Sequence, residues 1–141
     1  MTDTAQPPAP SKPALWIGRV LSGLFILFMI MDCTIKLLDL DVVKTASTEL
    51  GFPVSLDRLL GSLEFIGLVL YAIPRTSVLG GIILTGYLGG AIAAHLRVNS
   101  PTFTHTLFGL YLGLIAWGGL YLRNSRLRRL LPLDRTAVQQ P

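Results

Sequence analysis

Residues 15–38 read LWIGRVLSGLFILFMIMDCTIKLL, a long apolar run whose charged residues are Arg19, Asp32 and Lys36. The run is longer than the apolar core of a cleavable signal peptide, and no A-x-A-like cleavage site follows it. A helix of this length and composition is typical of a membrane span. We therefore predict a retained first span, with Trp16 at one membrane interface.

Three similar apolar runs follow the first, and the linkers and tails hold most of the charged residues. Short turns at Pro74 and Pro101 separate the last three runs, because proline stops a helix. The sequence therefore predicts an all-α integral membrane protein, an antiparallel four-helix bundle. Its expected membrane domain is 14–122, with spans near 15–38, 57–73, 77–96 and 104–122.

The composition supports a membrane protein over a soluble one. The chain has 141 residues, of which 51% are hydrophobic and 14% charged, and its mean hydropathy is +0.59. Soluble domains carry about 25% charged residues, so this chain has too little charge to cover a water-facing surface. The length corresponds to one domain.

The net charge of +4 does not indicate nucleic-acid binding. Five of the twelve basic residues follow the last apolar run, where they act as a topology signal and contact lipid headgroups. No aromatic residue alternates with them to stack on bases. These residues are Arg123, Arg126, Arg128, Arg129 and Arg135.

The segments outside the spans have their own patterns. Residues 1–13 contain four prolines and no apolar period, which predicts a disordered tail, and 123–141 form a basic tail. After the first span, residues 41–50 predict a short amphipathic helix on the membrane surface, which Gly51 and Pro53 end. With both termini in the cytoplasm, eight Lys and Arg residues lie inside and four outside, and we expect this orientation.

Ionisable residues of the spans gather in the outer half of the predicted bundle. Asp32 lies ~9 Å and Glu64 ~10 Å below the outer edge, at ~1.5 Å per residue. Lys36 is one helical turn from Asp32, so the two form either a register-fixing ion pair or part of a site. Glu64 has no local partner, and an acid inside a membrane indicates a functional site. The candidate polar pocket consists of Asp32, Lys36, Glu64, His95, Arg97 and His105.

Glycine motifs indicate close helix packing. G-x-x-x-G occurs at Gly86–Gly90 in the third predicted span and at Gly109–Gly113 in the fourth. Small residues at this spacing let two helices approach closely in lipid. We predict that these two spans form the tightest pair. The alternative is that glycine is simply frequent in membrane helices.

The sequence contains no self-contained catalytic motif, so no catalytic residue is predicted. Cys33 is the only cysteine, which excludes an intramolecular disulfide and a C-x-x-C redox motif. A phosphate-binding G-x-x-x-x-G-K-[ST] loop and a G-x-S-x-G nucleophile elbow are also lacking. His95 and His105 are brought together by the last turn, but their spacing specifies no metal, and we predict none.

Several stretches together resemble the DoxX-like family of small four-helix bacterial membrane proteins. They are MDCTIKLL, the LGFP turn, IPRTSVLGGIILTGYLGGAIAAHLRVNSPTF and HTLFGLYLGLIAWGGLYLRNSRLRRLLP, with GYLGGAIAAHLR at 86–97 the most specific. The resemblance covers about residues 16–132. It implies a multi-pass protein of the bacterial inner (plasma) membrane. It also favours a functional role for His95 and Arg97, because they lie in the stretch that resembles the family most specifically.

The family takes its name from a membrane subunit associated with a thiosulfate:quinone oxidoreductase, and other members are linked to redox homeostasis. The resemblance therefore implies a non-catalytic accessory subunit of a quinone-linked redox system, with a redox enzyme as partner. It specifies no cofactor; a quinone or a lipid headgroup is the candidate ligand of the polar pocket. Two alternatives remain: a small proton-coupled transporter that acts as a homo-oligomer, and a membrane scaffold or assembly factor. In each case the lipid bilayer is a partner.

Overall fold

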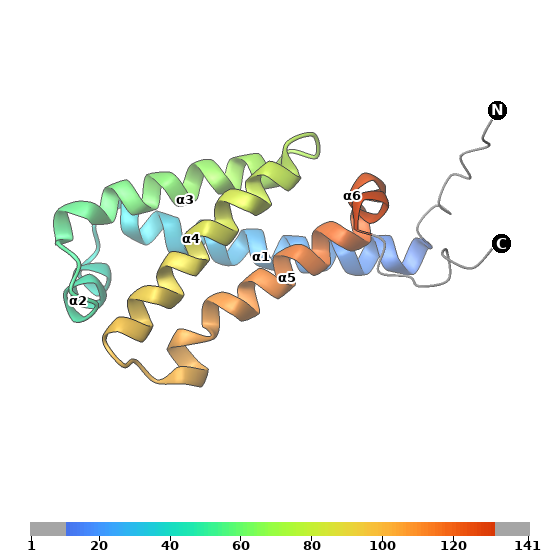
Figure 1. Ribbon diagram of the computed structural model, residues 1–141. Helices are drawn as coiled ribbons and strands as arrows, with labels where there is room; N and C mark the ends of the chain where they lie inside the picture. The colour runs from blue at the N-terminus through green and yellow to red at the C-terminus, as the bar shows by residue number, and fades with distance from the viewer. Residues whose placement is uncertain (1–10, 132–141) are drawn as a thin grey trace, which may run out of the picture.

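The computed structural model describes residues 11–131, and all regular elements in this range are helical (Figure 1). A 3-10 turn at Val54–Leu56 precedes α3, and a π-helical turn at Thr102–Thr106 precedes α5. The helices are α1 (Lys12–Leu37), α2 (Asp41–Glu49), α3 (Asp57–Ala72), α4 (Ser77–Arg97), α5 (Phe108–Arg123) and α6 (Ser125–Leu130).

Three of the helical segments are long and apolar enough to cross a membrane: Lys12–Leu37, Ser77–Arg97 and Thr102–Arg123. The predicted all-α fold is thereby confirmed, with three helices that could span a membrane. The helix α3 has 16 residues and is shorter than these three. It nevertheless packs against both α1 and α4, so it is an integral part of the same helical body.

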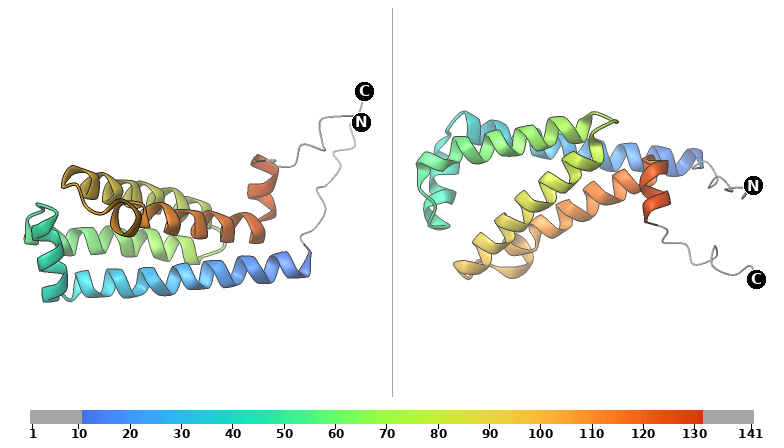
Figure 2. Two further views of the ribbon diagram at one scale, coloured as in Figure 1. Left: turned by 90° about the horizontal axis from the view of Figure 1, so that it is seen from below. Right: turned by 45° about the horizontal axis from the view of Figure 1, so that its top comes forward.

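The four long helices are close together at one end of the molecule and diverge at the other. The helix α1 packs against α3 and α5, and α4 packs against α3 and α5. From the turn between α3 and α4, the α4–α5 pair diverges from α3 toward the end where α2 crosses the molecule (Figure 2). We call the end at the α3–α4 turn, where the helices are close together, the narrow end, and the end at α2 the wide end. The side chains and backbone at the narrow end explain this shape.

Glycine backbones make the close contacts at the narrow end. A Cβ added to Gly80 of α4 would lie 2.6 Å from Tyr71 Cα and 2.7 Å from Gly67 O in α3. A Cβ added to Gly119 of α5 would lie 2.5 Å from Ser22 Oγ in α1. At these distances the helix backbones are in direct contact, which only glycine permits.

Tyr71 connects the helices at the same end. Its side chain is fully buried, and its hydroxyl donates a hydrogen bond of 2.8 Å to Ala116 O of α5. The hydroxyl also lies 3.3 Å from Ser22 Oγ of α1, and the Phe25 ring packs against the Tyr71 ring with centroids 5.0 Å apart. Because this hydroxyl bonds protein atoms in an apolar core, it avoids the cost of an unpaired buried polar group.

The predicted packing of the third and fourth spans through their glycine motifs is wrong. An added Cβ would meet nothing within 4 Å at Gly86, Gly90 or Gly113. Only Gly109 meets the other helix, where an added Cβ would lie 3.1 Å from Leu88 O. The tightest glycine contacts instead join α3 to α4 and α1 to α5. A small-residue motif permits close approach, but it does not specify which side of the helix a neighbour occupies.

The ends of the predicted segments also differ from the structure. The helix α1 begins at Lys12 with Pro13 in its first turn, so the last residues of the predicted disordered tail are helical; residues 1–10 lie outside the described range. In the predicted basic tail, Asn124 caps the short α6, and Leu127 is buried. Residues 132–141 of that tail also lie outside the described range.

The short helix predicted after the first span is present as α2, but its buried face differs from the expected one. Val43 and Ser47 are buried, whereas Val42 is 63% exposed. The Ser47 hydroxyl donates a hydrogen bond of 2.5 Å to Asp57 at the start of α3. This buried polar contact holds α2 against the start of α3.

Replacing Gly80 by alanine tests the narrow-end packing. The added methyl group has to displace backbone atoms of α3, so we expect Gly80→Ala to lower the free energy of unfolding by about 1–3 kcal/mol. Gly89→Ala on the same helix is the control, since an added Cβ there meets nothing within 4 Å. Thermal unfolding of the detergent-solubilised proteins measures both; equal melting temperatures would contradict this packing.

Candidate functional site

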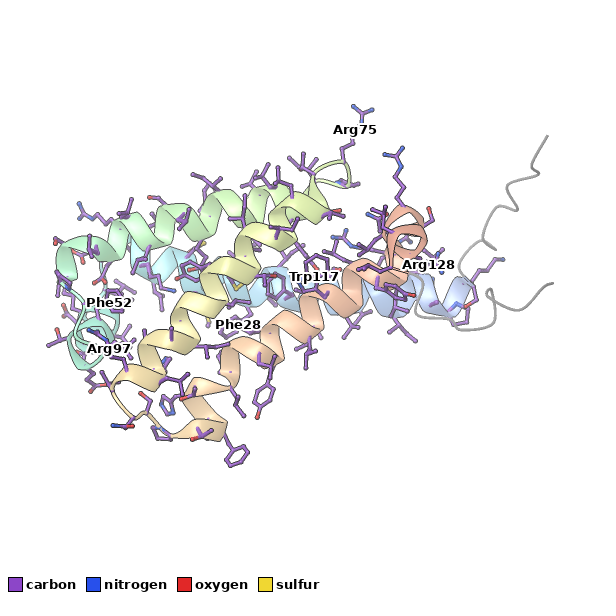
Figure 3. All side chains as sticks on the ribbon, in the orientation of Figure 1. Phe28, Phe52, Arg75, Arg97, Trp117 and Arg128 are labelled. Carbon is purple, nitrogen blue, oxygen red and sulfur yellow. The ribbon has the colours of Figure 1, made fainter. Side chains whose placement is uncertain are left out.

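The diverging helices border a partly open cavity of about 790 Å³ at the wide end of the molecule. Residues from α1 to α5 line it, most of them apolar, and α2 contributes Val42, Val43, Ala46 and Ser47. Phe28 of α1 packs against Phe108 of α5, with ring centroids 5.3 Å apart; Figure 3 labels Phe28 between α4 and α5. The cavity is therefore a largely apolar space with a few polar groups on its walls.

The composition of α4 explains why the cavity is not filled by side chains. Gly86, Gly90 and Ala94 of this helix are among the lining residues. Glycine and alanine add little or no volume to the helix backbone, so the wall of the cavity is close to the α4 axis. The glycine motif that does not pack α4 against α5 thus leaves room for a ligand.

An ionic cluster lies on the opposite wall. Lys36 Nζ donates to the Asp32 carboxylate one turn earlier on α1, and to Glu64 Oε2 of α3 at 2.9 Å. The Asp32 and Lys36 side chains are 28% and 17% exposed and line the cavity, whereas Glu64 is fully buried behind Lys36. The Tyr87 ring of α4 lies 5.5 Å from Lys36 Nζ.

Gly61 brings the members of this cluster within reach of one another. A Cβ added to Gly61 of α3 would lie 2.9 Å from Lys36 Cβ, so α3 approaches α1 closely at this point. Glu64 is three residues further along α3 and lies on the same face of the helix. The close approach therefore places a buried carboxylate beside the lysine.

The cluster has hydrogen-bonding capacity left for a ligand. A lysine ammonium has three N–H donors, and Lys36 uses two of them on Asp32 and Glu64. Glu64 Oε1 is buried and has no hydrogen-bond partner among the described residues. With one cation between two carboxylates, the cluster carries a formal charge of −1 when all three groups are ionised.

Two histidines line another part of the cavity. The rings of His95 and His105 are 5.8 Å apart between centroids. His95 Nδ1 lies 3.0 Å from Ser100 Oγ, and His105 Nδ1 lies 2.8 Å from Thr104 Oγ1. These hydroxyls orient the rings. Between residues 11 and 131, no group of three or more His, Cys, Asp and Glu side chains is arranged to hold a metal ion.

Arg97 lies apart from the rest of the predicted pocket. Its guanidinium donates to Leu50 O and stacks over the Phe52 ring at 5.6 Å (Figure 3). It also lies beside Gly51, whose φ of +69° favours glycine. Arg97 thus fastens the loop after α2 to the end of α4, a positioning role outside the cavity.

The structure brings four of the six predicted pocket residues onto the cavity wall and places Glu64 directly behind one of them. The sequence analysis missed Tyr87, which lies beside Lys36, and the Ser47–Asp57 contact that holds α2. Tyr87 is the one aromatic residue within GYLGG, and this could have suggested a specific role. The four lining residues are Asp32, Lys36, His95 and His105.

Comparison with known proteins identifies a family. A family model described as the DoxX-like family matches residues 20–119, more than half of the chain. The matched range contains the cavity and the ionic cluster. No curated protein and no solved structure matches the chain.

Removing the lysine tests the coupling within the cluster. Lys36→Met leaves the buried Glu64 without its cation, so we expect a loss of about 3 kcal/mol in the free energy of unfolding. Lys44→Met is the control, because Lys44 pairs with Asp41 and Asp39 at an exposed site, where such pairs contribute below about 1 kcal/mol. Unfolding in detergent measures both.

The double variant Lys36→Met/Glu64→Gln gives the sharper result. It replaces the buried carboxylate by a neutral amide, so we expect it to be more stable than Lys36→Met alone. With Glu64→Gln measured alone to complete the cycle, strictly additive losses of stability would show that the two side chains do not interact.

Proposed function

Because the chain belongs to the DoxX-like family, we propose that it is a non-catalytic accessory subunit of a membrane redox system that binds a quinone in the cavity between its diverging helices. The observation that carries the proposal is the position of Lys36, held between two carboxylates on the wall of a largely apolar cavity. A charged side chain on the wall of an apolar cavity suits a ligand that has a polar head and an apolar tail.

The chemistry of the cavity supports a quinone. Ligand cavities of about 300–1,000 Å³ with apolar walls and a few polar groups are typical of small-molecule sites. The remaining N–H of Lys36 could donate to a quinone carbonyl oxygen, while apolar side chains such as Met29 and Leu112 contact the ring and tail. Two imidazoles, from His95 and His105, offer further hydrogen bonds across the cavity.

The residues available support an accessory role over a catalytic one. Cys33 is buried, and no second cysteine exists with which it could exchange a disulfide. Electrons would therefore pass between the quinone and a partner enzyme, and this chain would hold the quinone in the membrane.

We further propose that α3 is a fourth span, with both termini in the cytoplasm of a bacterial cell. The 16 residues of α3 and the three-residue 3-10 turn before it together rise about 30 Å, which matches a hydrocarbon core. Arg75, Arg123 and Arg126 lie near the same end of the helical body, which is the expected cytoplasmic side.

A proton-coupled transporter is the second candidate. The observation that favours it is the fully buried Glu64, whose Oε1 has no hydrogen-bond partner. A carboxylate in this position next to a cavity could bind and release a proton. Four helices form a poor pore alone, so this function requires a homo-oligomer.

Fluorescent fusions at the two ends test the topology. A fluorescent protein that fluoresces only in the cytoplasm is fused to Met1 or to Pro141. Both fusions should be bright when four helices span the membrane. With three spans the termini lie on opposite sides, so one of the two fusions would be dark. Equal expression, checked by immunoblot, is the control.

A matched pair of glycine variants tests the quinone site. Gly90 lines the cavity and Gly89 does not, and an added Cβ meets nothing within 4 Å at either position. We expect Gly90→Phe to fill the cavity and to reduce the quinone that co-purifies in mild detergent at least tenfold. Gly89→Phe should retain it. Mass spectrometry of extracted lipids, with an absorption spectrum, gives the amounts.

The same preparations distinguish the alternatives. A redox enzyme that co-purifies with the wild type together with quinone would support the accessory subunit. Wild-type protein without quinone would contradict it; proton flux in liposomes that Glu64→Gln abolishes would then support the transporter. If the protein neither retains quinone nor supports proton flux, the scaffold or assembly factor is the remaining function.

A further inference from the structure

The end of the molecule opposite the cavity has an unbalanced charge. Arg75 lies in the turn between α3 and α4, and Arg123, Arg126 and Arg128 lie at the end of α5 and in α6. Every acidic residue that the structure describes lies between Asp32 and Glu64, in the second half of α1, in α2 and its loops, or in the first half of α3. The described part of the chain therefore supplies no carboxylate to these arginines.

Two of these guanidinium groups have donors shielded from solvent and without an acceptor. Within residues 11–131, buried Arg123 Nε has no hydrogen-bond partner, and neither do buried Nε and Nη2 of Arg128. Arg123 Nη2 donates to Tyr71 O at 3.2 Å, and the Arg123 guanidinium lies 5.2 Å above the Tyr71 ring. Figure 3 labels Arg128 at α6.

Helix packing explains why these arginines are shielded. A Cβ added to Gly18 of α1 would lie 3.1 Å from Arg123 N, so α1 passes directly against the end of α5. Asn124 then ends α5 and caps α6, because its Oδ1 accepts hydrogen bonds from the backbone N–H groups of Arg126 and Leu127. Leu127 is buried, so α6 packs one side against the helical body, and Arg128 on the same helix is partly buried.

Buried cationic donors without an acceptor are unfavourable, since they lose water and gain no partner. The acceptor that suits several guanidinium N–H groups is an oxyanion such as phosphate, which has several acceptor oxygens. We propose that Arg123 and Arg128 form a binding site for the phosphate of an anionic membrane phospholipid. This is a discrete site at two named side chains, in contrast to a general attraction of basic residues to the membrane surface.

Apolar surface around the site favours a lipid over a free phosphate ion. Leu130 at the end of α6 is 75% exposed, and the next residue, Leu131, is 50% exposed. On α1, Trp16 is 66% exposed and lies near Gly18. These side chains could contact the acyl chains and the interface while the arginines hold the headgroup. The inference does not depend on the quinone site.

The test compares Arg128→Gln with Arg126→Gln in the full-length protein. Arg126 is exposed on the same helix, so its variant removes one charge without touching the proposed site. Each protein is placed in nanodiscs of phosphatidylcholine, with or without phosphatidylglycerol, and melting temperatures are measured. Native mass spectrometry counts the phosphatidylglycerol retained after detergent extraction.

We expect phosphatidylglycerol to raise the melting temperature of the wild type and of Arg126→Gln. In Arg128→Gln this rise should be largely lost, with retained phosphatidylglycerol falling about tenfold. Equal losses in the two variants would overturn the discrete site in favour of general charge attraction. No effect of phosphatidylglycerol on the wild type would overturn the proposal.

Two further experiments distinguish a phospholipid from other anions that could pair with the arginines. If inorganic phosphate in phosphatidylcholine nanodiscs stabilises the wild type as well as phosphatidylglycerol does, the ligand is a free ion and the lipid proposal is wrong. If Asp134→Asn and Arg128→Gln lower the melting temperature equally in phosphatidylcholine nanodiscs, and neither changes the response to phosphatidylglycerol, the buried donors pair with the chain itself and the lipid proposal is wrong. Neither outcome affects the quinone measurement at Gly90.

Discussion

The arrangement of the molecule depends on the close contact of four helices around Tyr71. The Tyr71 hydroxyl of α3 bonds Ala116 O of α5 and lies within hydrogen-bonding distance of Ser22 in α1. The Tyr71 backbone meets Gly80 of α4 with no room for a side chain between them. One residue therefore connects all four long helices. In lipid, where the hydrophobic effect does not drive helices together, such backbone contacts and hydrogen bonds provide much of the association energy. Helices that are held this closely at one end, and that cross at an angle, must separate at the other.

The separation creates the cavity, and polar contacts maintain it. Lys36 connects α1 to α3 through Glu64. Arg97 fastens the loop after α2 to α4, and Ser47 fastens α2 to α3 through Asp57. These contacts hold the wide end in a defined shape without filling the space between the helices. The two ends thus use different interactions: glycine and tyrosine contacts where the helices touch, and charged side chains where they diverge.

The sequence predicts the features that depend on distance along a helix, and it fails where the outcome depends on the direction of a neighbour. Long apolar runs predict the membrane helices, since each backbone polar group in lipid must bond within its own helix. The constant helical rise places Asp32 and Glu64 at similar depth, and Lys36 indeed contacts both. The prediction that the glycine motif in α4 packs against α5 is wrong, because such a motif indicates a helix surface without side chains but not which element lies against that surface. The prediction places Arg97 in the pocket for a similar reason. Its position along α4 is close to that of the pocket, but its side chain contacts the loop after α2. Tyr87 and the cavity itself follow from the divergence of the helices, which no local pattern encodes.

The ionic cluster and the cavity beside it support the proposed ligand site. Exchanging a buried ion pair for apolar side chains of similar volume is often neutral or stabilising, so folding alone does not require Lys36 and Glu64. The same wall faces a helix whose Gly86 and Gly90 leave space where larger residues could have packed. A charge cluster and an unfilled volume each reduce the stability that this fold could reach, and here they occur together. Their coincidence in one place is what a binding site for a ligand with a polar head and an apolar body requires. A purely structural role would account for the ion pair alone, and it would leave the space beside it without a reason.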